Sequence, residues 1–158
     1  VRSGNVELPL MHWGSHQRRP HSAEYCFGDE AMNRYKDEGV CKIVYIDLPR
    51  HPRIEELRAR LSALNGLDVT SSWENNLELM PAGVGKGPAV SELAQRLGIK
   101  REQVMCLGDY DNDLSMIEYA GVGVAMENGS DRVKRAAAWI APSNQECGVA
   151  QAIRRFAL

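Results

Sequence analysis

The sequence predicts an α/β protein, with part of a parallel-stranded sheet in its second half and a small α+β module in its first. Two observations predict this class. Residues 83–158 alternate short apolar runs with amphipathic runs across short loops, as right-handed βαβ units do. Residues 1–82 instead combine helical periodicity with a hairpin signal. Doubly wound sheets usually have about five or more strands. The three predicted for the second half therefore indicate part of an α/β domain.

The first module is predicted to contain a strand, a helix and a hairpin. Residues 41–46 are rich in β-branched and aromatic side chains, which favour a strand. Pro52 suits the first turn of a helix, and Gly66 suits its end. Between them, apolar residues recur at helical spacing: Ile54, Leu57, Leu61 and Leu64. Residues 67–73 and 76–80 indicate two strands joined in a hairpin at Glu74-Asn75. Before these, residues 6–10 suggest a short strand and residues 31–35 a short helix.

The second module is predicted to begin after a composition break at residues 81–85. Strands are expected at residues 104–107, 122–126 and 139–141, and their apolar character is typical of strands covered on both faces. Short helices are expected at residues 114–120 and, with Ser130 as N-cap, through 137. Two further helices are predicted from their apolar faces. The apolar face of the first, which ends at Gly98, comprises Val90, Leu93, Ala94 and Leu97. The apolar face of the second, at the end of the chain, comprises Val149, Ala150, Ile153 and Ala157.

Composition excludes several classes of protein. Of 158 residues, 44% are hydrophobic and 25% charged, the profile of a soluble globular chain. The 19 Lys and Arg against 21 Asp and Glu give a net charge of −2, so no basic excess points to nucleic acid or to a membrane surface. No apolar run approaches the ~20 residues of a membrane span. No signal peptide opens the chain. The cysteine usage, described next, makes a reducing, cytoplasmic compartment the default expectation.

The cysteines indicate neither a zinc site nor a disulfide framework. Cys26, Cys41, Cys106 and Cys147 form no CxxC pair and have no histidine at zinc-ligand spacing. Cys41 and Cys106 lie in apolar runs, so we expect both in the core.

The strongest chemical signal is the acidic turn that runs from Gly108 to Asp113. Asp109, Asp111 and Asp113 lie within five residues, between an apolar strand and a helix. Ligands of open α/β sheets bind at the carboxyl ends of strands. A hard cation such as Mg²⁺ would relieve the repulsion among these carboxylates. The alternative is an acidic surface turn in which Asp113, or Asn112, only caps the helix.

Two further segments could bind an anion. Lys86 stands among glycines just before a helix, where an ammonium and free backbone amides could meet a phosphate. The spacing is not that of a P-loop, and the alternative is a flexible linker with a solvated lysine. A loop at residues 12–21 is rich in histidine and arginine and could bind an anionic substrate or a metal: His12, His16, Arg18, Arg19 and His21. Its alternative is a solvated loop.

Residues 77–87, 104–113 and 117–126 together resemble the haloacid dehalogenase (HAD) superfamily, and in particular its Cof-type phosphatases. The order is specific: a Lys-Gly step, then GDxxND about twenty residues on, then an AGVGVAM strand. The resemblance covers about residues 74–158. It implies a partial Rossmann-like core at 83–158. Residues 1–82 match the family's α+β cap of the C2B type only in the order of their elements.

The resemblance implies a role for four residues. Lys86 is similar to the family's third-motif lysine, which offsets charge on the nucleophile and the phosphoryl group. Asp109 and Asp113 resemble the fourth-motif carboxylates of a Mg²⁺ site, Asp113 acting directly or through water. Asn112 matches a position that contacts substrate phosphate. These roles suit phosphoryl transfer, which needs cations placed around the phosphoryl oxygens.

The sequence departs from the family pattern at the first motif, whose first Asp is the nucleophile. Asp109-Tyr110-Asp111 has the DxD spacing but lies in the fourth motif, and Asp47 is followed by Leu48-Pro49. No second-motif Ser or Thr is clear either. We therefore interpret the chain as the C-terminal part of a Cof-like phosphatase, inactive alone.

Two functions remain open at this point. One is a Mg²⁺-dependent phosphatase of small phosphorylated metabolites, present here without its nucleophile. The other is a non-catalytic domain that binds a cation or a phosphate ester, or that self-associates through an exposed core edge.

Overall fold

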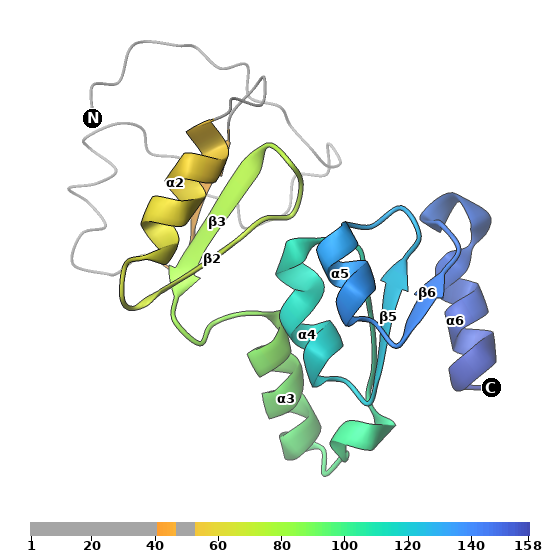
Figure 1. The fold of residues 1–158 in the computed structure, drawn as a ribbon. Helices are drawn as coiled ribbons and strands as arrows, with labels where there is room; N and C mark the ends of the chain where they lie inside the picture. The colour runs from red at the N-terminus through yellow and green to blue at the C-terminus, as the bar shows by residue number, and fades with distance from the viewer. Residues whose placement is uncertain (1–40, 47–52) are drawn as a thin grey trace, which may run out of the picture. The chain divides into compact units, whose positions relative to one another are not determined.

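A computed structural model describes residues 41–46 and 53–158 of the chain (Figure 1). Contacts divide the chain into residues 1–40 and 41–158, and all the described residues belong to the second unit. Two three-stranded sheets make up this unit, and the predicted boundary at 82/83 falls between them. The predictions for residues 6–10, 12–21 and 31–35, and for Cys26, lie outside the described residues.

The first sheet is antiparallel, with the order β1-β3-β2. It comprises β1 (Ile43–Ile46), β2 (Leu67–Thr70) and β3 (Asn76–Pro81), and the helix α2 (Arg53–Ser62) packs on one face (Figure 1). Side chains alternate across the sheet. Those facing α2 form a small core: Ile54, Leu77 and Leu79 with Leu57, Leu61, Leu67 and Val69. The register pairs Thr70 with Glu78, which places both side chains on the opposite face.

The predicted strand, helix and hairpin of this module are confirmed. The first hairpin strand is shorter than predicted, because it ends at Thr70 and residues 71–75 form the connection. The expectation for Cys41 is wrong: this residue is exposed. It lies two residues before β1, and the paired residues of β1 are themselves exposed.

The second sheet is parallel, with the order β4-β5-β6, as the alternation predicted. Its strands are β4 (Met105–Gly108), β5 (Val122–Met126) and β6 (Trp139–Ala141). The helices α4 (Leu114–Tyr119) and α5 (Asp131–Ala136) cover one face and α6 (Gly148–Phe156) covers the other (Figure 1). Successive residues of β5 serve the two layers, because Ala125 packs with Ile117 and Val133, whereas Val124 and Met126 pack with Ala141 and Ala152.

Two predicted helix faces are corrected. In α3 (Lys86–Arg96), Gly87 and Ala94 are buried, whereas Leu93 is 58% exposed and Leu97, just after the helix, is 62% exposed. In α6 the buried residues are Gly148 and Ala152, and not Val149 or Ile153. Small residues form the packed faces because the backbones approach closely. A Cβ at Gly148, for example, would lie 1.8 Å from the carbonyl oxygen of Pro142.

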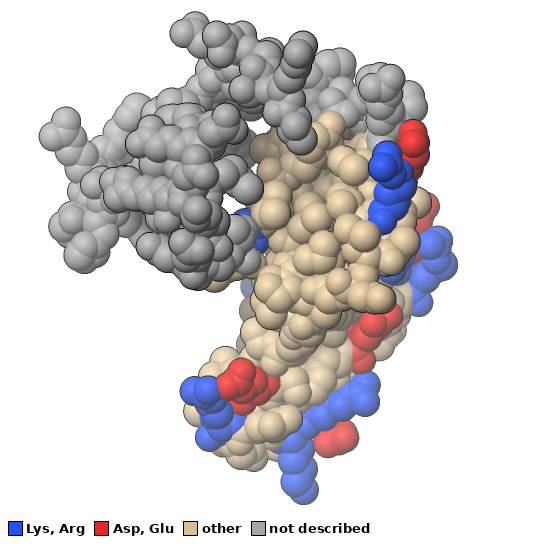
Figure 2. Space-filling view, turned by 90° about the vertical axis from the view of Figure 1, so that its left-hand side faces the viewer, with Lys and Arg blue, Asp and Glu red and all other residues tan. Residues whose placement is uncertain are grey.

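Cys106 lies inside β4 and is buried, as predicted. Burial raises the pKa of its thiol, so the thiol stays protonated at neutral pH. Among the described residues no helix has the length and apolar character needed to cross a bilayer. On the face shown in Figure 2, blue and red side chains lie next to one another along the right-hand edge and the lower end of the described part of the chain, beside a broad tan surface.

Candidate active site

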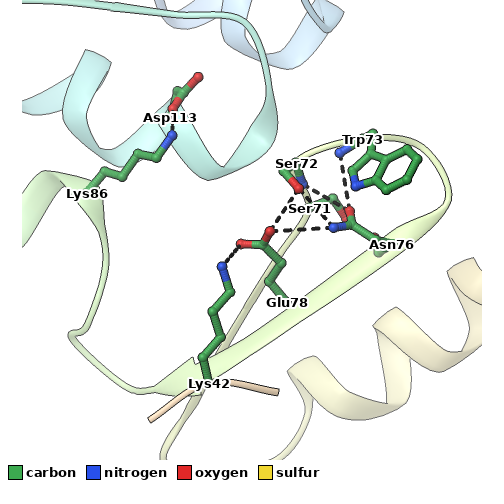
Figure 3. Close-up of polar contacts among 8 residues, drawn as sticks. All are labelled: Lys42, Ser71, Ser72, Trp73, Asn76, Glu78, Lys86 and Asp113. Carbon is green, nitrogen blue, oxygen red and sulfur yellow. Dashed lines mark hydrogen bonds and ion pairs between the residues drawn. The ribbon is translucent and has the colours of Figure 1, made fainter. Parts of the chain in front are cut away.

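The acidic turn lies at the carboxyl end of β4, where the short 3₁₀ helix η2 (Asp111–Asp113) leads directly into α4. The last residue of η2, Asp113, is buried. One carboxylate oxygen of Asp113, Oδ2, accepts hydrogen bonds from the backbone N–H of Asp109 at 2.9 Å and of Tyr110 at 3.4 Å. The other oxygen, Oδ1, pairs with the ammonium of Lys86 (Figure 3). The turn is thus closed on itself and tied to α3.

Lys86 is the first residue of α3, and the close packing of α3 on α4 brings it to the turn. The backbone N–H of Gly87 donates to Oγ of Ser115 in α4 at 3.0 Å. A Cβ at Gly87 would lie 2.5 Å from the carbonyl oxygen of Ser115, so only glycine allows this approach. Half of the Lys86 side chain stays exposed, at 49%.

The other acidic residues of the turn have different surroundings. Asp111 is held against α5, because its carboxylate accepts from Oγ of Ser130 at 3.0 Å and pairs with Arg132 at 3.5 Å. Asp109 is exposed, and its backbone carbonyl accepts from the N–H of Ser130 at 2.8 Å. The backbone N–H of Asn112 donates to the carbonyl oxygen of Ser71 at 2.9 Å.

A cavity of about 600 Å³ opens beside the turn. Its lining includes Lys86, Asp111 and Asn112 from the second module, and Lys42 and Glu78 from the first. Asp109 and Asp113 are not among the described lining residues. Acidic and basic side chains thus share the wall of this cavity.

The side chains of the turn offer a metal ion oxygen ligands, which are the kind that Mg²⁺ prefers. In residues 41–46 and 53–158 no group of three or more His, Cys, Asp or Glu side chains is placed to hold a metal ion. Asp113 already uses both oxygens, whereas no described residue engages the carboxylate of Asp109. Mg²⁺ keeps several waters and takes one or two protein carboxylates beside substrate phosphate. If Mg²⁺ binds here, Asp109 would be its direct ligand, and Asp113 would hold the turn and Lys86.

The structure thus brings together Lys86, Asn112 and Asp113, three of the four predicted site residues, and leaves Asp109 exposed beside them. The alternative in which Asp113 caps the helix is confirmed in its position only. Asp113 takes the N-cap position without a side-chain cap bond, because its carboxylate turns back to the amides of Asp109 and Tyr110.

Sequence reasoning missed the residues that support the site. Ser130 was expected only as the N-cap of α5, and it does accept from the N–H of Val133 at 3.4 Å. It also anchors Asp111. Ser71, Ser115 and the Lys42–Glu78 pair had no signal of their own, because their partners come from distant segments.

Glu78 is the centre of a polar network in the first module (Figure 3). Its carboxylate pairs with the Lys42 ammonium at 2.7 Å and accepts from Oγ of Ser72 at 2.8 Å and from Nδ2 of Asn76 at 3.5 Å. Burial alone would raise the pKa of Glu78. Lys42, Ser72 and Asn76 outweigh that effect and leave the pKa below its ordinary value, so the carboxylate is charged at neutral pH.

Comparison with known proteins decides the family. The model of the haloacid dehalogenase-like hydrolase family matches residues 8–153. The chain belongs to this family. The solved structure of a haloacid dehalogenase-like hydrolase from Bacillus subtilis superposes with a TM-score of 0.69 at 34% identity, covering 75% of this chain and 41% of that one. The match confirms the α/β fold predicted from the sequence.

Two relatives of this haloacid dehalogenase-like chain have more specific names. The 5-amino-6-(5-phospho-D-ribitylamino)uracil phosphatase YcsE of Bacillus subtilis is 41% identical over 109 residues, which are 69% of this chain and 42% of YcsE. The HAD subclass IIB sugar phosphatase BT4131 superposes with a TM-score of 0.68 at 26% identity, covering 78% of this chain and 46% of that one. The chain therefore spans less than half the length of these relatives.

Gly87→Ala tests the packing that delivers Lys86. Alanine gains up to about 1 kcal/mol of helix propensity, but overpacking against the Ser115 backbone costs about 1–3 kcal/mol. We expect a net loss in the free energy of unfolding, measured by urea denaturation. Gly85→Ala is the matched control. A Cβ there meets its nearest atom at 3.8 Å, and the backbone φ of 174° is extended. Equal stabilities of the two variants would contradict the close approach of α3 and α4.

Glu78→Gln tests the Lys42–Glu78 network through pH. Because the folded-state pKa of Glu78 is lowered, its carboxylate stabilises the fold above the ordinary carboxyl pKa, and this contribution is lost as the pH falls through the lowered value. The variant should be less stable than the native chain at neutral pH, and the difference should shrink and vanish once the pH has fallen below the lowered pKa of Glu78. Parallel denaturation series across pH measure it. A difference that is constant with pH would show that the charge is not responsible.

Proposed function

We propose that the chain carries the phosphate-binding and Mg²⁺-binding part of a phosphatase that acts on small phosphorylated metabolites. The observation that carries the proposal is the contact of Lys86 with the acidic turn, beside a cavity lined by Lys86 and Asn112. A cation and a set of carboxylates at one edge of a parallel sheet suit phosphoryl transfer.

In this proposal each residue has a distinct task. Lys86 directs its ammonium to the oxygens of the phosphoryl group, and its bond to Asp113 keeps it there. Asn112 contacts the same phosphate from the turn. Asp109 holds Mg²⁺, which when bound neutralises charge on the phosphoryl oxygens. Asp113 supports the metal site by holding the amides of Asp109 and Tyr110.

The substrate class and the lack of turnover belong to the same proposal. YcsE and BT4131 are named as phosphatases of a phosphoribityl compound and of sugars, which supports a small phosphate ester as the ligand. The printed sequence holds no DxD pair that fits the first motif. We therefore infer that this chain binds phosphate and Mg²⁺ but turns over little or no substrate by itself.

A second candidate is self-association through the sheet edge. Among the described strands β4 has a neighbour on one side only, and Leu93 on α3 is largely exposed. Both features favour pairing with another chain. A domain that only self-associates would not need Lys86 for phosphate binding.

Lys86→Met tests the phosphatase proposal. Inorganic phosphate is titrated into the native chain in the presence of Mg²⁺, and binding is measured by calorimetry. The native chain should bind phosphate, and this variant should lose that binding. The charge-assisted bond it removes is worth about 1.5–3 kcal/mol, or roughly ten- to a hundredfold in affinity. Lys100→Met, which removes an exposed lysine outside the cavity lining, should bind like the native chain.

Two further arms complete this test. Asp109→Asn should remove the Mg²⁺ dependence of phosphate binding while leaving the Lys86–Asp113 pair in place. A phosphatase assay on the native chain should give negligible turnover. Robust Mg²⁺-dependent turnover would contradict the inference that this chain lacks a nucleophile. Equal phosphate binding by Lys86→Met and Lys100→Met would show that Lys86 is not part of the site.

A further inference from the structure

A backbone hydrogen bond joins the acidic turn to the first module. The N–H of Asn112 donates to the carbonyl oxygen of Ser71 at 2.9 Å. The side-chain hydrogen bonds and ion pairs of Asp111 and Asp113 come from α3, from α5 and its N-cap, or from the turn itself. Asn112 is proposed to contact the phosphate. The residues that fix the Ser71 carbonyl therefore also influence the position of Asn112.

The Ser71 carbonyl belongs to the same planar peptide unit as the N–H of Ser72. That N–H donates to Oδ1 of Asn76 at 3.0 Å (Figure 3). The carbonyl and the N–H of a trans peptide point in opposite directions. Asn76 therefore holds the peptide from one side while Asn112 engages it from the other, and the direction of the carbonyl follows from the Asn76 contact.

Asn76 is itself fixed. It is 2% exposed, and its Oδ1 also accepts from the N–H of Trp73 at 3.2 Å. Its Nδ2 donates to Oγ of Ser72 at 2.8 Å and to Glu78 at 3.5 Å. The amide side chain thus uses its acceptor and its donor within one segment of the chain, which leaves the Ser71–Ser72 peptide little freedom.

Arg58 holds the same segment from α2. Its guanidinium donates to Oγ of Ser71 at 2.6 Å, and this hydroxyl in turn donates to the carbonyl oxygen of Asn76 at 2.6 Å. Ser71 is fully buried, so loss of Arg58 would leave the acceptor side of its hydroxyl without this partner. The contacts form a continuous path from Arg58 and Asn76 to the Asn112 amide.

We propose that Asn76 is a positioning residue of the phosphate site. It orients the peptide between Ser71 and Ser72. The carbonyl of this peptide holds the backbone N–H of Asn112 and so directs Asn112 toward the cavity. Arg58 supports the same peptide through the Ser71 hydroxyl. This inference rests on the proposed function only for the step from Asn112 to phosphate. The coupling between Asn76 and the Asn112 amide stands on the hydrogen bonds alone.

The test compares Asn76→Ala with Asn75→Ala, the same substitution one residue earlier, where Oδ1 is buried without a hydrogen-bond partner. Hydrogen exchange of single amides is followed by NMR. We expect Asn76→Ala to speed exchange at Asn112 by about three- to tenfold, the scale of one lost hydrogen bond. The amide of Ala125, in the central strand β5, should be unchanged. Asn75→Ala should change neither amide.

A milder pair covers the case in which Asn76→Ala does not fold. Arg58→Ala should speed exchange at Asn112 in the same direction, whereas Arg60→Ala, an exposed arginine on the same helix, should not. Arg58→Lys, which keeps a donor, should restore part of the protection. Equal acceleration at Asn112 and Ala125 would mean a merely structural role and would overturn the proposal, as would an unchanged rate at Asn112.

Titration with inorganic phosphate and Mg²⁺ on the same variants tests the step to the site. Asn76→Ala, or Arg58→Ala in its place, should weaken phosphate binding by a similar factor, and the matched control should not. Faster exchange at Asn112 with unchanged phosphate affinity would overturn the positioning role. If the native chain binds no phosphate, the proposed function fails, and amide exchange still decides whether Asn76 controls the Asn112 amide.

Discussion

The ion pair between Lys86 and Asp113 is the contact on which the candidate site depends. Asp113 is almost fully buried, and a buried carboxylate is costly unless it is paired and hydrogen-bonded. Lys86 and two backbone amides supply those partners. Because loss of Lys86 would leave the buried carboxylate with fewer partners, the same contact stabilises the turn and ties Lys86 to it.

Two glycines make this contact sterically feasible. A Cβ at Gly108 would lie 2.3 Å from the Cβ of Asp113, so a side chain there would displace the carboxylate from the amides it holds. Gly87 has the corresponding role on the other side, where α3 approaches the backbone of Ser115. The Lys-Gly and Gly-Asp steps of the sequence are thus geometric requirements of one site, and they lie on separate elements of the second module.

Local patterns predicted the elements well, and tertiary packing explains where they did not. The parallel strands followed from short apolar runs, and the hairpin followed from two strand-like segments around Glu74-Asn75. The buried faces of α3 and α6 could not be predicted, because close backbone packing selected Gly87 and Gly148 over the larger apolar residues. Helical periodicity identifies an apolar stripe but not which neighbours cover it.

The same limit applies to the candidate site. Lys86 and the acidic turn could be singled out because each has an unusual residue pattern beside a helix start. The network of Asn76 and Glu78 could not, since a polar residue in a short strand shows its role only when its partners are known. Asn76, at the first position of β3, is polar and yet buried, and the sequence pattern does not predict that burial.

A crystal structure of the native chain grown with Mg²⁺ and inorganic phosphate would test the central claim most directly. The account predicts a phosphate within hydrogen-bonding distance of the Lys86 ammonium and the Asn112 side chain, and Mg²⁺ on the carboxylate of Asp109 beside it. Phosphate bound away from Lys86, with the metal on other residues, would contradict the assignment of this turn as the phosphatase site.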